Sequence, residues 1–188
     1  MRTGTFVRVA VVALAMTFAA SMASAQALSS GAQTIALNAT LAESLTLSLS
    51  ANAVNFTLSA GSAANPGSTG VTATTAWTLK PGRTAVAVYA YFASTTALTD
   101  GAGDNIPSSA FKISDNGGAS TALTNTVAFG AANAGLQLGA STAITGANKT
   151  GSRSDAMTFN IDLTGGTLPQ LPAAVYTGTL NIQAQATP

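Results

Sequence analysis

Strict alternation of apolar and polar residues near the start of the chain most limits what it can fold into. Between Gln33 and Leu41 every second position is apolar, and these positions are Ile35, Leu37, Ala39 and Leu41. After Ala42-Glu43-Ser44, the same period returns in Leu45, Leu47 and Leu49. Because successive side chains of an extended strand point to opposite faces, each run predicts a β-strand with one apolar face.

Short apolar segments separated by turn residues continue along the rest of the chain. They predict strands over 54–58, 71–79, 84–93, 110–114, 119–123, 126–129, 136–144, 156–163 and 174–186. The strongest is 84–93, "TAVAVYAYFA", which has bulky residues on both faces and is therefore expected in the middle of a sheet. Asp115-Asn116-Gly117-Gly118 predicts a hairpin turn. Many short strands indicate an all-β sandwich or barrel.

The first 25 residues have the pattern of a secretory signal peptide. Arg2 and Arg8 precede or interrupt a short apolar run, and Ala23-Ser24-Ala25 forms a small-residue cleavage pattern. The apolar run is shorter than the roughly 20 residues of a spanning helix. We therefore expect residues 26–188 to form a single exported domain with no transmembrane helix in the mature chain, located in the periplasm, at the outer surface or outside the cell.

Composition removes several classes of function. Without Arg2 and Arg8, 5 of the 7 basic residues remain against 6 acidic ones, and they are scattered singly, so no nucleic-acid partner is expected. The chain has no histidine and no cysteine, which excludes Ser-His-Asp and Cys-His catalytic sites, the usual zinc ligands and disulfides. We expect no enzyme activity, no catalytic residue, no metal and no cofactor.

One set of motifs imitates a penicillin-binding enzyme. Ser109 and Lys112 form S-x-x-K, Ser114-Asp115-Asn116 forms S-D-N, and Lys149-Thr150-Gly151 forms K-T-G. An S-x-x-K nucleophile needs both side chains on one helix face, whereas the residues around Lys112 predict a strand. The match is therefore interpreted as a coincidence of composition.

Two further features are weak candidates for ligand binding. Asp100-Gly101-Ala102-Gly103-Asp104-Asn105 places carboxylates as in a calcium loop but lacks the later glutamate, so an ordinary turn is the preferred interpretation. Trp77, Tyr89 and Tyr91 are candidates for a sugar-stacking platform, although Trp77 is expected in the core. An outer-membrane barrel is a further alternative, disfavoured because the aromatic residues are few and scattered.

The layout of the chain resembles the spore coat protein U and archaic chaperone–usher pilin superfamily. The resembling parts are the alternating extension Ile35 to Leu41, the element Val54-Asn55-Phe56, and the closing segment Tyr176 to Ile182. The cysteine pair common in that superfamily is missing, and Gly178 stands where an aspartate is usual. The resemblance implies an immunoglobulin-like β-sandwich of short antiparallel strands.

The resemblance also implies assembly by β-strand addition. Ile35, Leu37, Ala39 and Leu41 would then be donor-strand contacts that fill an apolar groove of a neighbouring subunit. Self-association, a periplasmic chaperone and an outer-membrane usher are the partners implied. The alternative is that 33–41 is the first strand of a self-sufficient sandwich. We expect an exported structural or adhesive surface protein, resembling a pilus or coat subunit; a monomeric glycan-binding module is the alternative.

Overall fold

The structure is a computed structural model that describes residues 28–124, 126–127, 129 and 135–188. The predicted signal peptide and part of the predicted strand 126–129 lie outside these residues. The chain divides into two units, one ending at Thr40 and the other comprising Leu41–Pro188. Among the residues described, no helix is long and apolar enough to cross a membrane.

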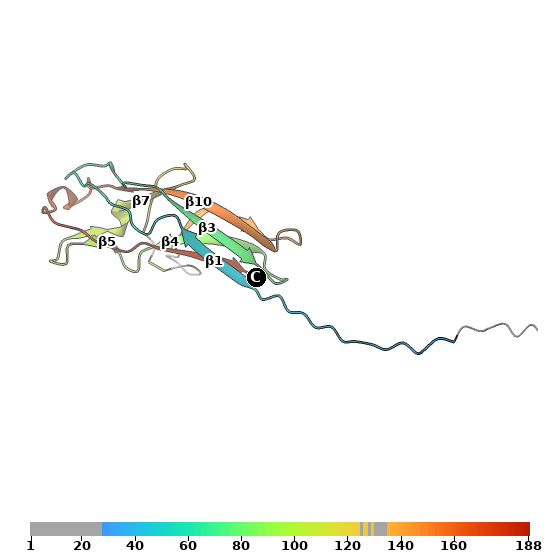
Figure 1. Cartoon of the computed structure of the whole chain (residues 1–188). Coiled ribbons are helices and arrows are strands. Elements are labelled where there is room, and N and C mark those ends of the chain that lie inside the picture. Colours follow the sequence, from blue (N-terminus) through green and yellow to red (C-terminus); the bar gives the residue numbers. More distant parts are fainter. Residues whose placement is uncertain (1–27, 125, 128, 130–134) are drawn as a thin grey trace, which may run out of the picture. The chain divides into compact units, whose positions relative to one another are not determined.

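The second unit is built from antiparallel sheets (Figure 1). One sheet has the order β1-β3-β10-β7-β8 with β2 paired to β10, a second has the order β11-β4-β9, and β5 and β6 form a two-stranded ribbon. The bounds are β1 Ser44–Leu49, β2 Asn65–Pro66, β3 Val71–Thr78, β4 Ala85–Tyr91, β5 Thr96–Thr99, β6 Asn105–Pro107, β7 Phe111–Asp115, β8 Thr121–Ala122, β9 Leu136–Ala143, β10 Thr150–Ile161 and β11 Asn181–Thr187. Two short 3-10 helices, η2 Ser108–Ala110 and η3 Leu168–Gln170, interrupt the loops.

A common apolar core joins the two larger sheets. Ala73 of β3 and Ile113 of β7 lie in the same buried cluster as Val88 of β4 and Leu138 of β9. All four side chains are at most 1% exposed. Apolar faces of two sheets that share one core make a sandwich-like all-β fold, which confirms the predicted class.

Several predicted elements are confirmed closely. The predicted strand 71–79 is β3, and Trp77 is buried with its Nε1 donating to the carbonyl of Asn148 at 3.0 Å. The predicted central strand 84–93 is β4, which lies between β11 and β9. The predicted hairpin joins β7 to β8, and Asn116 and Gly117 adopt the positive φ values of 49° and 73° that such a turn needs.

Other predicted elements are wrong or shifted. Residues 33–41 form no strand among the described residues, although their alternation predicts one. Segment 54–58 makes only a bridge between Phe56 and Gly67, and 174–180 precedes β11 rather than belonging to it. β10 begins at Thr150, six residues before the prediction, because its polar start hid the strand.

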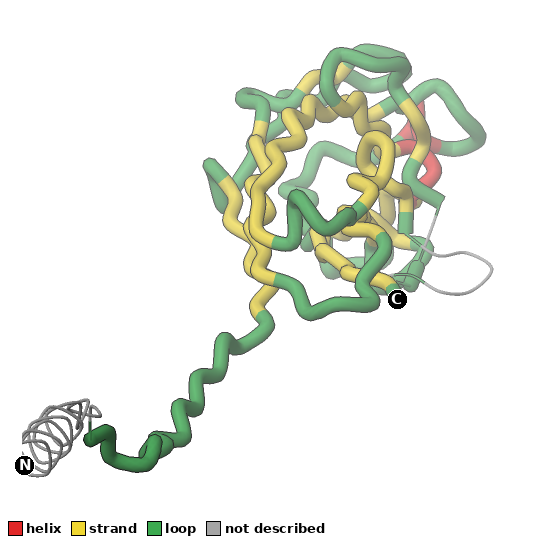
Figure 2. Tube along the Cα trace, turned by 90° about the vertical axis from the view of Figure 1, so that its right-hand side faces the viewer, coloured by secondary structure: helices red, strands yellow, loops and turns green. Residues whose placement is uncertain are grey.

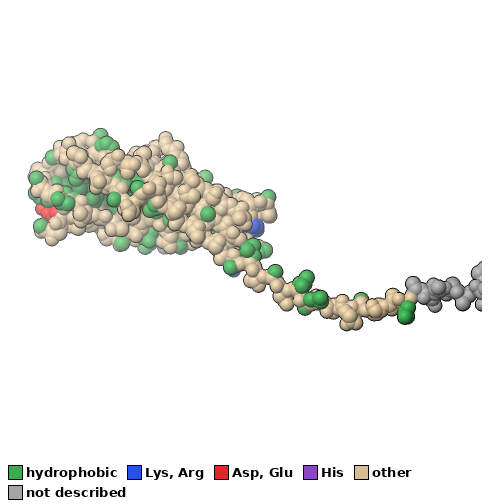
Figure 3. All heavy atoms as spheres, in the orientation of Figure 1, with side chains coloured by type: hydrophobic (Ala, Val, Ile, Leu, Met, Phe, Trp, Pro, Cys, Tyr) green, Lys and Arg blue, Asp and Glu red, His purple; other side chains and the backbone are tan. Residues whose placement is uncertain are grey.

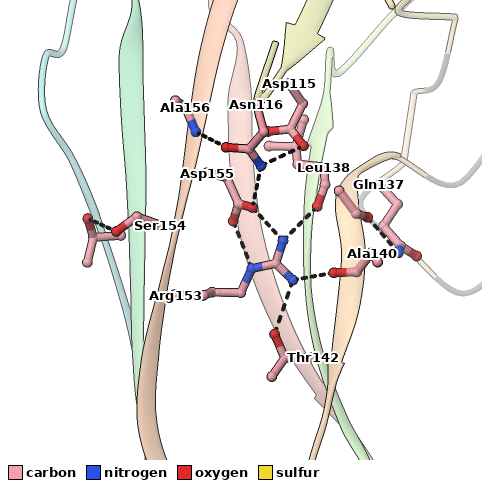
Figure 4. Close-up of polar contacts among 12 residues, drawn as sticks. Asp115, Asn116, Gln137, Leu138, Ala140, Thr142, Arg153, Ser154, Asp155 and Ala156 are labelled. Carbon is pink, nitrogen blue, oxygen red and sulfur yellow. Dashed lines mark hydrogen bonds and ion pairs between the residues drawn. The ribbon is translucent and has the colours of Figure 1, made fainter. Parts of the chain in front are cut away.

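That polar start contains a buried ion pair which joins the two sheets (Figure 4). The guanidinium of Arg153 on β10 donates to the carboxylate of Asp155, with Nε to Oδ2 at 2.9 Å. It also donates to the carbonyls of Leu138 at 3.0 Å and Ala140 at 2.6 Å, both on β9 of the other sheet. The Arg153 and Asp155 side chains are 12% and 2% exposed. One side chain therefore links the sheets in a chain without disulfides.

β9 is irregular where it receives this guanidinium. Its register with β4 shifts between Val86 and Val88, and Gly139 has a φ of 59°. A Cβ atom added at Gly139 would lie 3.0 Å from Asp115 Oδ2 and 3.1 Å from Arg153 Nη2. Glycine is thus required both by the backbone conformation and by the close approach of the ionic groups.

The contacts of Arg153 predict that removal of its charge strongly lowers the stability of the fold. Arg153→Met would leave the Asp155 carboxylate buried and unpaired, so we expect unfolding to require about 3–5 kcal/mol less free energy. Chemical denaturation followed by circular dichroism measures this loss. Lys112→Met is the matched control because the Lys112–Asp162 pair is partly exposed (32% and 21%) and should contribute no more than about 1 kcal/mol. Equal losses would contradict the structural role of Arg153.

The environment of Asp115 predicts that the free energy of unfolding depends on pH. Burial, and then the nearby Asp155 carboxylate, raise the pKa of Asp115, while Arg153 opposes the shift. A raised folded-state pKa means that the favourable contribution of Asp115 is complete below its unfolded-state pKa and is lost as the pH rises through the folded-state pKa. Asp115→Asn should therefore gain stability relative to the parent between about pH 4 and pH 7. Denaturation at both pH values, with exposed Asp104→Asn as control, checks this; a pH-independent difference contradicts it.

Candidate strand-binding groove

The second unit contains a groove of about 970 Å³ beside the ends of β1 and β11. One wall is the segment 49–60, which follows β1, and the other is the segment 171–182, which leads into β11. Core residues form its floor: Val71, Phe92, Phe111, Met157, Phe159 and Ile161. Hydrophobic side chains are visible at the surface of the same end of this unit, near β5 (Figure 3). The floor residues themselves are buried, each at most 6% exposed, so the groove exposes mainly the apolar side chains of its walls.

The walls are only partly covered. Phe56 packs edge-on against the ring of Phe111, with centroids 5.8 Å apart, but remains half-buried. Leu49 is 44% exposed and Val175 is 81% exposed. Large apolar side chains at the margin of a core are stabilised when a further apolar group covers them.

The groove lies between two sheet edges that are not joined to each other. β1 ends one sheet and β11 ends the other, and each has a strand partner on one side only. Cα atoms of β1 and β11 approach within 8 Å. Two strands that flank an inserted strand are about 9.6 Å apart, so a further strand has room only beyond Leu49, where the walls are the segments 49–60 and 171–182.

The wall 171–182 is held by its neighbours in a strand-like position. Thr177 exchanges two backbone hydrogen bonds of 2.9 Å with Thr99 of β5. Tyr176, Leu180 and Ile182 pack against the core, as predicted from their alternation. Burial raises the pKa of the Tyr176 phenol, as do the Asp104 and Asp100 carboxylates. Its hydroxyl donates to the carbonyl of Pro172 at 3.0 Å.

None of the described residues that line this groove is charged. Its polar lining groups are neutral: the amides of Asn52 and Asn55, the hydroxyls of Thr177, Thr179 and Tyr176, and the backbone. Burying an ion would require a partner charge, whereas burying apolar side chains and pairing backbone groups would not. The groove is chemically suited to an uncharged, apolar strand.

Residues 28–43 contain such a segment, drawn as loop in Figures 1 and 2. Ile35 is 84% exposed, Leu37 is 90% exposed and Leu41 is 85% exposed, and Ala39 is also exposed. The run from Gln33 to Leu41 carries no charge. Figure 3 shows hydrophobic side chains standing out along this part of the chain. The four predicted donor-strand residues thus lie in a segment that forms no strand among the described residues.

The penicillin-binding motifs do not come together. Lys112 pairs with Asn160 near the end of β10, whereas Lys149 immediately precedes its first residue. Eleven residues of extended strand separate these positions by roughly 36 Å. The amine of Lys112 binds Asp162 at 2.7 Å, and Ser114 donates to the Gly118 carbonyl within the hairpin.

The residues of the calcium-loop and sugar-platform candidates are also not arranged as predicted for ligand binding. Oδ1 of Asp100 accepts the backbone N–H groups of Ala102, Gly103 and Asp104, and these bonds, that of Ala102 first, lower the pKa of the carboxyl. The described residues hold no group of three acidic side chains placed to bind a metal ion. Trp77 is 4% exposed and therefore absent from any platform, whereas Tyr89 and Tyr91 share one outer face.

The sequence signals identified only half of this arrangement. Alternation located the extension and the wall that leads to β11, but the wall 49–60 was predicted to contain an ordinary strand. Its polar interruptions, Asn52 and Asn55, were the available sign that this segment lies at an edge. The buried Arg153–Asp155 pair had no such sign because its residues read as an exposed loop.

Gly178 gives a test of the groove wall. A Cβ atom there would lie 1.8 Å from the carbonyl oxygen of Ala97, so Gly178→Ala must move the wall away from β5. We expect a loss of about 1–3 kcal/mol in the free energy of unfolding. Gly165→Ala is the control, since its Cβ would meet nothing within 4 Å. Chemical denaturation distinguishes the two, and a harmless Gly178→Ala contradicts the close approach.

The sequence was compared with protein-family models and with curated proteins. The sequence matches no protein-family model, and no curated protein shows significant similarity to it. The functional inference therefore depends on the groove and the extension of this chain.

Proposed function

We propose that this protein is an exported structural subunit that polymerises by β-strand addition, its segment 33–41 entering the groove of a neighbouring copy. One observation carries the proposal: the same chain holds an uncovered, uncharged apolar groove and an uncharged extension with Ile35, Leu37 and Leu41 at least 84% exposed. Burying each of these side chains contributes about 1.5–3 kcal/mol. The resemblance to pilin-like subunits and the signal-peptide pattern agree with it.

Strand periodicity fits the two parts together. With Ile35, Leu37, Ala39 and Leu41 directed into the groove, the residues Thr34, Ala36, Asn38 and Thr40 face outward. The backbone of the inserted segment pairs with the free edges of the acceptor, which gives affinity without sequence-specific side-chain bonds. A periplasmic chaperone and an outer-membrane usher would protect the groove before assembly.

The position of the segment in the chain favours a second copy as the acceptor. β1 begins at Ser44, whereas the groove begins at Leu49. To reach its own groove, the segment would have to reverse within Ala42 and Glu43 and then run back along β1. The Glu43 carboxylate is held there by Arg83 Nε at 2.7 Å. Head-to-tail contacts of this kind produce filaments unless the rotation between copies closes a ring.

Leu37→Asp tests the proposal, with Asn38→Asp as the matched control. Both add one carboxylate to the extension, but Leu37 faces the groove and Asn38 faces solvent in the proposed register. We expect the parent and Asn38→Asp to form multimers in size-exclusion chromatography, and Leu37→Asp to remain a monomer with an unchanged circular dichroism spectrum.

Addition of a peptide covering residues 33–41 should raise the melting temperature of the Leu37→Asp monomer, because a ligand at 100 times its Kd stabilises by about 2.7 kcal/mol. The same peptide with aspartate at position 37 should have no effect. A parent that remains monomeric and gains no stability from the peptide would refute assembly through this groove. Unfolding of Leu37→Asp would instead place the segment in the core of its own chain.

A further inference from the structure

The sheet formed by β11, β4 and β9 carries no charged residue on any of its strands. Their sequences are NIQAQAT, AVAVYAY and LQLGASTA. Its inner face supplies Val88, Ala90 and Leu138 to the core, all fully buried. Its outer face is therefore a neutral surface of rings, amides and small side chains.

Two tyrosines occupy the middle of that outer face. Tyr89 and Tyr91 alternate with the buried Val88 and Ala90, so both rings lie on the side away from the core, and both are half-buried. The Tyr89 ring also packs against Phe129, with ring centroids 5.8 Å apart, so Phe129 adds a third ring to this face. Two residues along a strand are about 6.8 Å apart. The rings thus lie in a row on a rigid central strand.

Amide side chains flank this row on both neighbouring strands. In register with Tyr89 are Gln183 on β11 and Gln137 on β9, both exposed. Asn181 is in register with Tyr91, and the Tyr91 hydroxyl lies 3.3 Å from Gln183 Oε1. Each amide offers two donors and an acceptor, and none carries a charge.

This combination matches the chemistry of an uncharged carbohydrate. A pyranose ring has an apolar C–H face that packs on an aromatic ring, and a rim of hydroxyls that pair with amides. Tyrosine supplies such contact area with little loss of side-chain entropy. A polyanionic ligand would need basic residues, which these strands lack.

We propose that the outer face of this sheet, centred on Tyr89 and Tyr91 with Gln137 and Gln183, binds a neutral polysaccharide. The proposal goes beyond polymerisation and does not depend on it. It gives each subunit a site by which the protein could adhere to an uncharged glycan surface. Trp77, buried in the other sheet, takes no part.

The test uses the mature chain on immobilised neutral polysaccharides (β-glucan, mannan and galactan) and on acidic alginate. We expect saturable binding to at least one neutral polysaccharide and none to alginate. Tyr89→Ala/Tyr91→Ala should weaken it about tenfold, as expected for central aromatic contacts. Tyr89→Phe/Tyr91→Phe keeps both rings and should retain most of the affinity. Thr46→Ala/Ser48→Ala, on the exposed face of β1, should change nothing.

A second pair of variants covers the case in which loss of both rings disturbs folding. Gln137→Ala/Gln183→Ala alters exposed side chains only and should also weaken binding while circular dichroism stays unchanged. Absence of binding to all three neutral polysaccharides overturns the proposal, as does equal binding by the parent and the tyrosine and glutamine variants. If the tyrosine variants alter multimer length but not glycan binding, the face is an interface between copies and the proposal is wrong.

Discussion

The unjoined edges of β1 and β11 are the constraint on which the rest of this structure depends. Each strand completes one sheet of the sandwich, and beyond Leu49 nothing in the described chain bridges the gap between the sheets. The floor residues Phe111 and Phe159 are well buried, yet the walls that should cover them are irregular and half-exposed. The partly exposed apolar walls and their uncharged lining agree with the proposal that this groove receives a further apolar segment.

Because this core is incomplete, the stability of the domain depends more on contacts elsewhere in the fold. With no cysteine to join the sheets, Arg153 connects β10 to the carbonyls of β9 and shares its charge with the buried Asp155. Removing either partner would leave the other charge buried and unpaired, which is costly. The cluster therefore acts mainly by fixing the relative position of the two sheets. A second buried cluster also joins the sheets: Trp77 of β3 and the adjacent Leu79 pack with Val86 of β4 and with Ile144. The two sheets are thus held together away from the groove, which remains open.

The regular strands could be predicted because their partners come from the same chain. β3 and β4 have alternating or fully apolar patterns, and the Asn116-Gly117 turn has a local conformational signal. Residues 33–41 have an equally regular pattern but form no strand among the described residues, since alternation specifies an apolar face and not what covers it. The start of β10 was not predicted, for the opposite reason. Arg153 and Asp155 are polar, and only their contact with each other makes the burial of their side chains tolerable. The extension and one groove wall were therefore predictable, whereas the groove itself required the fold.

Strand addition at this groove would also enlarge the neutral surface next to this sheet. A segment inserted into the groove lies beside residues 171–180, which lead into β11 of the sheet that contains β4 and β9. In the proposed register its outward side chains are Thr34, Ala36, Asn38 and Thr40, which continue the uncharged surface around Tyr89 and Tyr91. Two properties that were considered as rival functions from the sequence, assembly and glycan contact, then become compatible, because the strand that completes one subunit's core enlarges its outer face. The absence of charge serves both: it allows the extension to be buried without a counterion, and it leaves the surface of the assembled subunit suited to a neutral partner.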